Sequence, residues 1–379
     1  MAHIVFLRTA AADLTAGKPP LRGVPASAPL SAAAAAIPAS QEADVAVWRD
    51  GASPLAPAAA TVIGLLSSLD VVAFLAAHPG GAAAAMRTPA GDVVAHEPAL
   101  VREVEPHTRL IEIVELMKQG ARRVLVRKNI TEACTVVDKK PFAPFYKAVL
   151  KITGGPKAAA SAKAVGQSSS SAPAAFGCDR YCCLTREDIV RFLINCLGAL
   201  APTPLQSISS LGAVNRGYAH VEASSPAIQA SWRVPSEPRA VAVVRTNRDG
   251  SHKVLADVSA HRLWLRDYVA AADAMASLSS LSFAAGVDGH GMVPPDDDDV
   301  DAAAPSPRAS RLSSGRDGHG GNAALRCRGT SSLAAIMAQM LSYRSTHIWV
   351  TDAQDDVLVG VVGYMEIFNA VTRGVALPA

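Results

Sequence analysis

A junction that recurs along the chain, in which a short apolar strand leads into a helix, limits most strongly how this sequence can fold. The first copy occupies residues 62–75, where five apolar residues precede Ser67, Asp70 follows three positions later, and apolar residues then recur at helical spacing. A second copy, at 181–193, has the same order of side-chain chemistry. Its hydroxyl and acidic positions are Thr185 and Asp188. Such self-similarity predicts a fold built from repeated units.

Two weaker copies of the junction lie further along the chain. The copy at 254–265 has Arg262 where the acidic residue is expected. The copy at 357–368 has Gly363 in place of the hydroxyl residue and Glu366 in place of the aspartate. The sequence therefore predicts four repeats, of which the third departs furthest from the pattern.

Each junction is preceded by a predicted helix and a predicted strand. These pairs are 30–37 with 45–48, 108–119 with 123–127, 226–230 with 240–244, and 332–341 with 347–351. In the last repeat, the polar residues 352–356 predict a hairpin turn before the final strand. Each unit thus reads as strand-helix-strand-strand-helix, which places the chain in the mixed α/β class.

This unit resembles the cystathionine-β-synthase (CBS) domain. The resemblance rests on 64–70, Gly-Leu-Leu-Ser-Ser-Leu-Asp, and on 183–188, Cys-Leu-Thr-Arg-Glu-Asp, each in an apolar-strand context. Together with the segment 13–22 and the number of repeats, it is similar to a plant branch of CBS-domain proteins. That branch resembles the γ regulatory subunits of AMP-activated and sucrose-non-fermenting-related kinases. The resemblance implies four CBS-type repeats paired into two Bateman modules, with clefts for adenosine-type ligands.

The repeats and the stretches between them define the expected organisation. Repeat 1 is expected at 10–80, repeat 2 at 95–200 with a flexible insert at 154–175, a degenerate repeat 3 at 203–285, a disordered linker at 286–322 and repeat 4 at 323–379. The insert and the linker are rich in small, polar and turn-forming residues and lack a helical or strand period. Serines beside Arg308 and Arg311 in the linker indicate either a kinase target or an ordinary loop.

The hydroxyl and acidic residues of the first two junctions are the candidate ligand contacts. A carboxylate such as Asp70 or Asp188 can accept hydrogen bonds from both hydroxyls of a ribose, at about 1.5–3 kcal/mol each. Ser67 and Thr185 precede helix N-termini, which favour negative charge, so they are suited to a ribose oxygen or a phosphate. The alternative is that both pairs are capping boxes that serve helix stability alone.

Arg122 and Arg123 precede the second strand of repeat 2. The kinase-subunit resemblance implies that basic residues at this edge reach nucleotide phosphates, and His347 holds a similar position in repeat 4. The alternative for each is a solvated or ordinary strand start. Arg262 has no acceptor atom and cannot bind a ribose diol. The second module is therefore expected to be structural or to serve as a partner platform.

Composition limits the remaining functional classes. A net charge of +3 disfavours a strongly basic nucleic-acid binder, and no apolar run approaches the roughly 18 residues of a membrane span. The six cysteines fit no zinc-binding spacing, so free thiols in a reducing compartment are expected, with metal or redox chemistry at Cys178, Cys182 and Cys183 as the alternative.

No phosphate-binding loop, zinc-protease motif or nucleophile elbow is found in the sequence, so a catalytic role is not expected. We expect a regulatory protein, located in the cytoplasm or alternatively in the nucleus or a plastid, that needs no cofactor. Its regulatory ligand would be AMP, ADP, ATP or S-adenosylmethionine, and its partner a protein kinase or another enzyme. A ligand-independent interaction scaffold with degenerate CBS sites is the second hypothesis.

Overall fold

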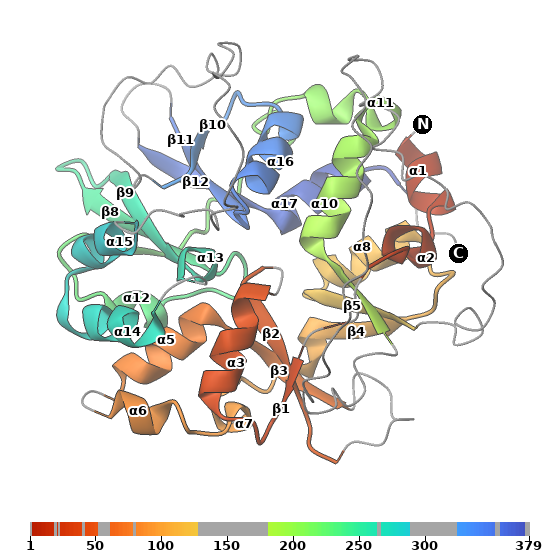
Figure 1. Ribbon diagram of the computed structural model, residues 1–379. Helices are drawn as coiled ribbons and strands as arrows, with labels where there is room; N and C mark the ends of the chain where they lie inside the picture. Colours follow the sequence, from red (N-terminus) through yellow and green to blue (C-terminus); the bar gives the residue numbers. More distant parts are fainter. Residues whose placement is uncertain are drawn as a thin grey trace, which may run out of the picture.

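The strands of the computed structural model form one three-stranded sheet for each repeat (Figure 1). The described residues are 2–18, 21, 23–39, 42–51, 61–78, 81–127, 181–263, 267–288, 324–352 and 357–375. The sheets are β1 (Gly23–Pro25), β2 (Asp44–Trp48) and β3 (Val62–Ser67); β4 (Val101–Val104), β5 (Arg123–Arg127) and β6 (Tyr181–Thr185); β7 (His220–Glu222), β8 (Ala240–Thr246) and β9 (His252–Ser259); and β10 (Arg326–Arg328), β11 (His347–Thr351) and β12 (Leu358–Gly363). In every sheet the first two strands are parallel and the last two antiparallel. The expected α/β class with four CBS-type repeats is confirmed.

The helices that follow the first and third strands cover these sheets. They are α3 (Leu30–Ala36) and α5 (Ser68–Ala76) in repeat 1, α8 (Leu110–Lys118) and α10 (Arg186–Asn195) in repeat 2, α12 (Ile228–Trp232), α13 (Ala260–Leu263), α14 (Tyr268–Ser277) and α15 (Ser280–Asp288) in repeat 3, and α16 (Leu333–Ser342) and α17 (Tyr364–Thr372) in repeat 4. Shorter elements join them: α6 (Ala82–Ala85), α7 (Ala90–Val93), α11 (Leu197–Leu200), and 3-10 turns at Ile37–Ala39, Pro98–Leu100 and Thr203–Leu205. Figure 1 shows the repeats placed around a common centre.

Sheets pair within each half of the chain. The sheet of repeat 1 packs on that of repeat 2 through a cluster that includes Trp48, Leu65 and Leu125. The sheet of repeat 3 packs on that of repeat 4 through a cluster that includes Val244 and Trp349. These apolar strand faces are buried only when two sheets meet, so the chain forms two Bateman modules.

Helices pair across the two modules. In one core cluster, α5 of repeat 1 packs against α14 of repeat 3. In the other, α8 and α10 of repeat 2 pack against α17 and α16 of repeat 4. The apolar stripe of each helix therefore faces a repeat that is not its neighbour in the sequence, and this arrangement closes the molecule around its centre.

Several local predictions agree with these elements. The strands expected at 123–127 and 347–351 are β5 and β11, and the weak helix expected at 226–230 corresponds to α12. After the third junction, α13 spans Ala260–Leu263, and residues 264–266 lie outside the described residues. α15 ends at Asp288, past the predicted end of repeat 3 at residue 285. The insert at 154–175 and the serines near Arg308 lie outside the described residues.

The N-terminal helices were not predicted. α1 (Ala2–Arg8) and α2 (Ala11–Thr15) pack beside repeat 2, and the Phe6 side chain is fully buried in the core shared by repeats 2 and 4. No helix among the described residues is long and apolar enough to cross a membrane.

Candidate functional site

The candidate residues lie at one end of every sheet because of strand register. In each repeat, the first residue of the second strand faces the last residue of the third strand. These pairs are Asp44 with Ser67, Arg123 with Thr185, Ala240 with Ser259, and His347 with Gly363. Since the following helix begins at the same place, strand ends and helix N-termini meet at the centre of the molecule.

Both predicted hydroxyl–carboxylate pairs form capping boxes. Asp70 Oδ2 accepts from the backbone N of Ser67 at 2.9 Å and from its Oγ at 2.7 Å. Asp188 Oδ2 accepts from the backbone N of Thr185 at 2.8 Å and from its Oγ1 at 2.9 Å. The helix-capping interpretation is therefore confirmed, and the structure contains no ligand that would test the ribose-binding interpretation.

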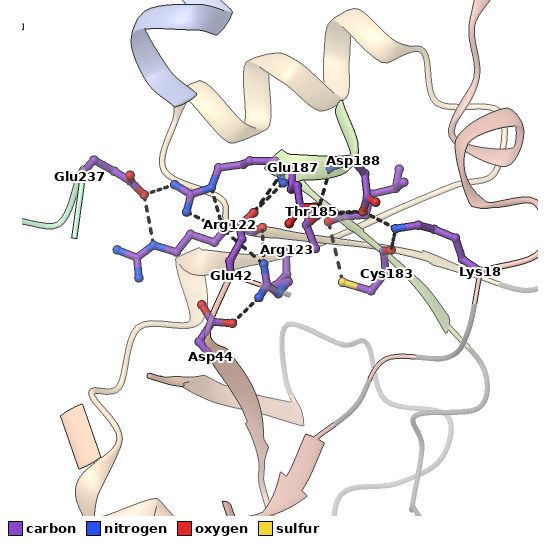
Figure 2. A network of polar contacts seen from close by, with 12 residues as sticks. Lys18, Glu42, Asp44, Arg122, Arg123, Cys183, Thr185, Glu187, Asp188 and Glu237 are labelled. Carbon is purple, nitrogen blue, oxygen red and sulfur yellow. Dashed lines mark hydrogen bonds and ion pairs between the residues drawn. The ribbon is translucent and has the colours of Figure 1, made fainter. Parts of the chain in front are cut away.

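Each of these aspartates also has a cationic partner from a distant part of the chain. The Asp70 carboxylate accepts hydrogen bonds from both terminal nitrogens of Arg239, with Nη2–Oδ1 at 2.5 Å and Nη1–Oδ2 at 3.1 Å. Asp188 is paired with Lys18 Nζ, which also donates to the carbonyl oxygen of Cys183 at 3.2 Å (Figure 2). Burial alone would raise the pKa of Asp70, but Arg239 and Ser67 outweigh it and lower that pKa. Asp70 is therefore an ionised acceptor that already has a charged donor.

The predicted arginines are buried. Arg122 and Arg123 are each 3% exposed, so the solvated-edge interpretation is wrong. Arg123 forms an ion pair with Asp44 through Nη2 and lies 3.4 Å from Glu42 Oε2 through Nη1. The β5 strand begins at Arg123 inside the packed centre, and that position buries both side chains.

Arg122 points in the other direction, toward the second module. Its Nε lies 3.2 Å from Glu237 Oε1, and its Nη2 donates to the carbonyl oxygen of Ser236 at 2.5 Å. Burial lowers the pKa of Arg122, and Glu237 opposes that shift. Arg122 therefore links repeat 2 to repeat 3, and Arg123 links it to repeat 1.

Arg186, the first residue of α10, connects all four repeats. Its guanidinium binds Glu42 of repeat 1, with Nη2–Oε2 at 2.6 Å and Nε–Oε2 at 3.2 Å, and also forms an ion pair with Glu237 of repeat 3. The same group lies over the ring of Tyr364 in repeat 4, 4.9 Å from its centroid. A cation–aromatic contact of this kind stabilises a desolvated guanidinium.

The central charges balance. Among the described residues, four arginines face four carboxylates: Arg122, Arg123, Arg186 and Arg239 against Glu42, Asp44, Asp70 and Glu237. Buried charges are retained where they are paired and hydrogen-bonded. We call this set of eight residues the charged centre. In this structure, the basic groups that could meet a phosphate are neutralised by the protein's own acids.

A second buried polar cluster lies between repeats 3 and 4. Asp257 Oδ1 binds Arg262 Nε at 2.9 Å, while its Oδ2 lies 3.4 Å from His347 Nε2 and accepts from Ser259 Oγ at 2.9 Å. Arg262, which replaces the aspartate of the third junction, therefore neutralises an acid of its own repeat. His347 is 2% exposed and belongs to this cluster.

A pocket of about 350 Å³ lies away from the predicted site. It is lined by residues before β7 and at the ends of β10 and β11, including Arg216, Arg328, Thr330 and Asp352. None of the six predicted ligand-contacting residues lines it. The pocket and the predicted ribose contacts are therefore separate features.

The cysteines form no metal site in the described part of the chain. Cys182, Cys183, Cys196 and Cys327 are free thiols, and no group of three metal-ligating residues occurs among the described residues. Cys178, which the metal alternative requires, lies outside those residues.

Six side chains of the site were missed at the sequence level: Lys18, Glu42, Asp44, Arg186, Glu237 and Arg239. Arg186 had a local signal, since a cation in the first turn of a helix opposes the helix dipole and needs a compensating acid. Glu42 and Glu237 lie in irregular segments before second strands, where no periodic pattern marks them.

Comparison with known proteins identifies the family. None of the family profiles compared matches the chain. The CBS domain-containing protein CBSX6 of Arabidopsis thaliana is 39% identical over 404 aligned positions, which cover 97% of this chain and 94% of that protein. This chain belongs to the CBS domain-containing proteins. CBSX5 of the same plant is 24% identical over 400 aligned positions, which cover 94% of this chain and 95% of that protein.

A solved structure supports the CBS arrangement independently of sequence. The protein MJ1225 from Methanocaldococcus jannaschii, described as an archaeal homologue of γ-AMPK, superposes with a TM-score of 0.55 at 9% identity. The match covers 95% of this chain and 99% of that one. At this identity the likeness concerns the fold, and it extends over all four repeats.

Proposed function

We propose that this CBS-domain chain is a non-catalytic regulatory protein that binds an adenosine-containing ligand and modulates a partner enzyme, such as a protein kinase. The observation that carries the proposal is the pair of equivalent junctions, Ser67–Asp70 and Thr185–Asp188, at the central ends of two paired sheets. Each places an ionisable carboxylate and a hydroxyl beside a helix N-terminus.

The chemistry of these junctions suits a nucleoside with phosphate. A carboxylate can accept from two vicinal ribose hydroxyls, and the start of the helix favours a nearby anion. Arg122 and Arg123 belong to the same module and would supply the positive charge once a ligand displaced their own acids, Glu237 and Asp44. The fold of the γ-AMPK homologue agrees with a regulatory role in an enzyme complex.

Binding would require an exchange of partners. Asp70 holds Arg239, and Asp188 holds Lys18, so a ribose diol would replace a cation at either carboxylate. Arg239 belongs to the second module, and breaking its pair with Asp70 would loosen the contact between modules. A ligand that favours one arrangement over the other shifts the population between them, and a partner enzyme can respond to that shift.

Calorimetric titration of the full chain with AMP, ADP, ATP and S-adenosylmethionine tests this function. Asp70→Asn and Asp188→Asn keep the side-chain shape and remove the charge, and we expect each to weaken the tightest ligand about 10-fold or more. Asp273→Asn, at an exposed position of α14, is the matched control and should bind as the wild type does. Absence of binding at millimolar ligand, or unchanged affinity in both site variants, would overturn the proposal.

The second candidate function is a ligand-independent scaffold. It is favoured by the charged centre, in which every basic group has an acid from the same chain. A scaffold would bind its protein partner with the same affinity in the presence and absence of each nucleotide. A partner affinity that changes with nucleotide would support the regulatory function instead.

A further inference from the structure

Five nitrogen donors converge on the carboxylate of Glu42. Its Oε1 accepts from the backbone N of Arg186 at 2.9 Å and of Glu187 at 3.4 Å. Its Oε2 accepts from Arg186 Nη2 and Nε, and Arg123 Nη1 lies 3.4 Å away. The Glu42 side chain is 1% exposed. Burial alone would raise the pKa of Glu42, but the two guanidiniums outweigh it and hold that pKa at about 2.

This donor set is one that suits a phosphate group. Two backbone N–H groups at the start of the ten-residue helix α10 and two guanidiniums converge on one carboxylate. Guanidiniums and helix N-termini both favour phosphate oxygens. Arg123 and Arg186 are buried at 3% and 4% exposure, and their other carboxylate partners are Asp44 and Glu237, so an anion at the Glu42 position completes the balance of charge.

The backbone that carries Glu42 is strained. Glu42 and Ala43 have φ values of 57° and 55°, in the left-handed region that residues with a side chain rarely adopt. Each such residue costs roughly 1–2 kcal/mol. Ala43 precedes Asp44, the first residue of β2 and the ion-pair partner of Arg123. The contacts of the Glu42 carboxylate therefore hold this turn against its local preference.

We propose that Glu42 is a built-in anionic occupant of a phosphate-monoester site formed by Arg123, Arg186 and the start of α10, and that a phosphate group binds there only by displacing it. The inference deepens the proposed function and rests on it for the class of ligand. Displacement would release the strained turn at 42–43 and, through Asp44, the start of β2. The Glu42 carboxylate thus occupies the phosphate position in the free protein. Its displacement by a phosphate would change the conformation of repeat 1 at the start of β2.

Vacating the position tests this inference. Glu42→Ala removes the occupant, and Glu42→Gln keeps its shape but removes its charge. Glu115→Ala is the matched control, because Glu115 is half-buried, pairs with Lys118 at 2.8 Å, and its removal changes the net charge equally. Thermal unfolding and calorimetry are measured with inorganic phosphate, against sodium chloride at equal ionic strength.

We expect Glu42→Ala to bind inorganic phosphate at least about 10-fold more tightly than the wild type or Glu115→Ala, with a midpoint of unfolding that rises with phosphate concentration. Glu42→Gln should show the same change to a smaller extent. The double variant Glu42→Ala/Arg123→Gln should lose most of the gain, since it lacks one of the two guanidiniums. A Glu42→Ala chain that is unfolded in chloride and folds in phosphate supports the proposal equally.

Two outcomes overturn the proposal. One is a phosphate response in both Glu42 variants that is no larger than in Glu115→Ala. The other is a Glu42→Ala chain that stays unfolded at every phosphate concentration while Glu42→Gln gains no phosphate binding. Because these tests use phosphate alone, their failure is distinct from failure of the adenosine titrations on the wild-type chain.

Discussion

Truncation of Arg186 to alanine should destabilise the protein far more than truncation of any exposed arginine. Arg186 compensates Glu42, whose side chain is 1% exposed, and Glu237, whose side chain is 23% exposed. Without it, Glu42 keeps only Arg123 at 3.4 Å as a cationic partner. Removing one partner of a buried ion pair costs about 3–5 kcal/mol, because the other charge remains buried. We therefore expect Arg186→Ala to lower the free energy of unfolding by about 3–5 kcal/mol.

The same helix provides the control. Arg191 pairs with Glu187 at 2.5 Å one turn apart, but its side chain is 57% exposed. An exposed pair of this spacing contributes about 0.3–0.5 kcal/mol. Arg191→Ala changes the same residue type and the same net charge, so the difference between the two variants isolates burial.

Urea unfolding at pH 7, followed by tryptophan fluorescence and far-UV circular dichroism, measures both variants. The double variant Arg186→Ala/Glu42→Gln should be less destabilised than the sum of its single changes by about 1–3 kcal/mol, because it removes the stranded charge as well. Equal costs for Arg186→Ala and Arg191→Ala, or strict additivity in the double variant, would refute the role assigned to Arg186.

Three further predictions concern pH, packing and thiol reactivity. The pKa of Glu42 lies at about 2, below its usual 4.5, so the ionised carboxylate contributes about 3 kcal/mol to the free energy of unfolding above pH 4.5, and this contribution is lost as pH falls toward 2. Unfolding measured across this pH range should show the loss, and Glu42→Gln should abolish this pH dependence. In Gly64→Ala the added Cβ would lie 2.2 Å from the carbonyl oxygen of Ala95, so we expect the free energy of unfolding to fall by about 1–3 kcal/mol. Gly198→Ala, where the added Cβ would meet open space, should leave the free energy of unfolding unchanged in chemical denaturation. Desolvation of the half-buried Cys183 thiol raises its pKa to about 12, so iodoacetamide at pH 8 should label it at least about 100-fold more slowly in the native protein than in urea. Equal labelling rates by peptide mass spectrometry would contradict the raised pKa.

The repeat architecture could be predicted because its signals are local. The order of strand, hydroxyl residue and helix at 62–75 and 181–193 depends on side chains that are adjacent in sequence, and both capping boxes follow from it. The first strand of each repeat is only three or four residues long, which is too short for a clear period. These strands could not be placed from the sequence alone.

The charged centre could be predicted only in part, because its pairs join distant segments. Glu42 and Arg186 are 144 residues apart, and Asp70 and Arg239 are 169 apart. A sequence pattern shows that an arginine is present, but not which carboxylate reaches it. The burial of Arg122 and Arg123 follows from the closure of four repeats around them, whereas the sequence left open whether these residues contact a phosphate or lie at a solvated strand edge.

The pairing of helices across modules also has a consequence for how the protein is made. During synthesis from the N-terminus, repeats 1 and 2 leave the ribosome with the apolar faces of α5, α8 and α10 uncovered, since their partners α14, α16 and α17 come later in the chain. Contacts between residues so far apart in sequence form slowly, and exposed apolar helices are prone to aggregate meanwhile. Tyr364, the first residue of α17, completes the surroundings of Arg186. A chain truncated before α17 would therefore lack both its last core helix and the aromatic ring that packs on Arg186. Folding of the whole protein thus depends on synthesis of the C-terminal helix.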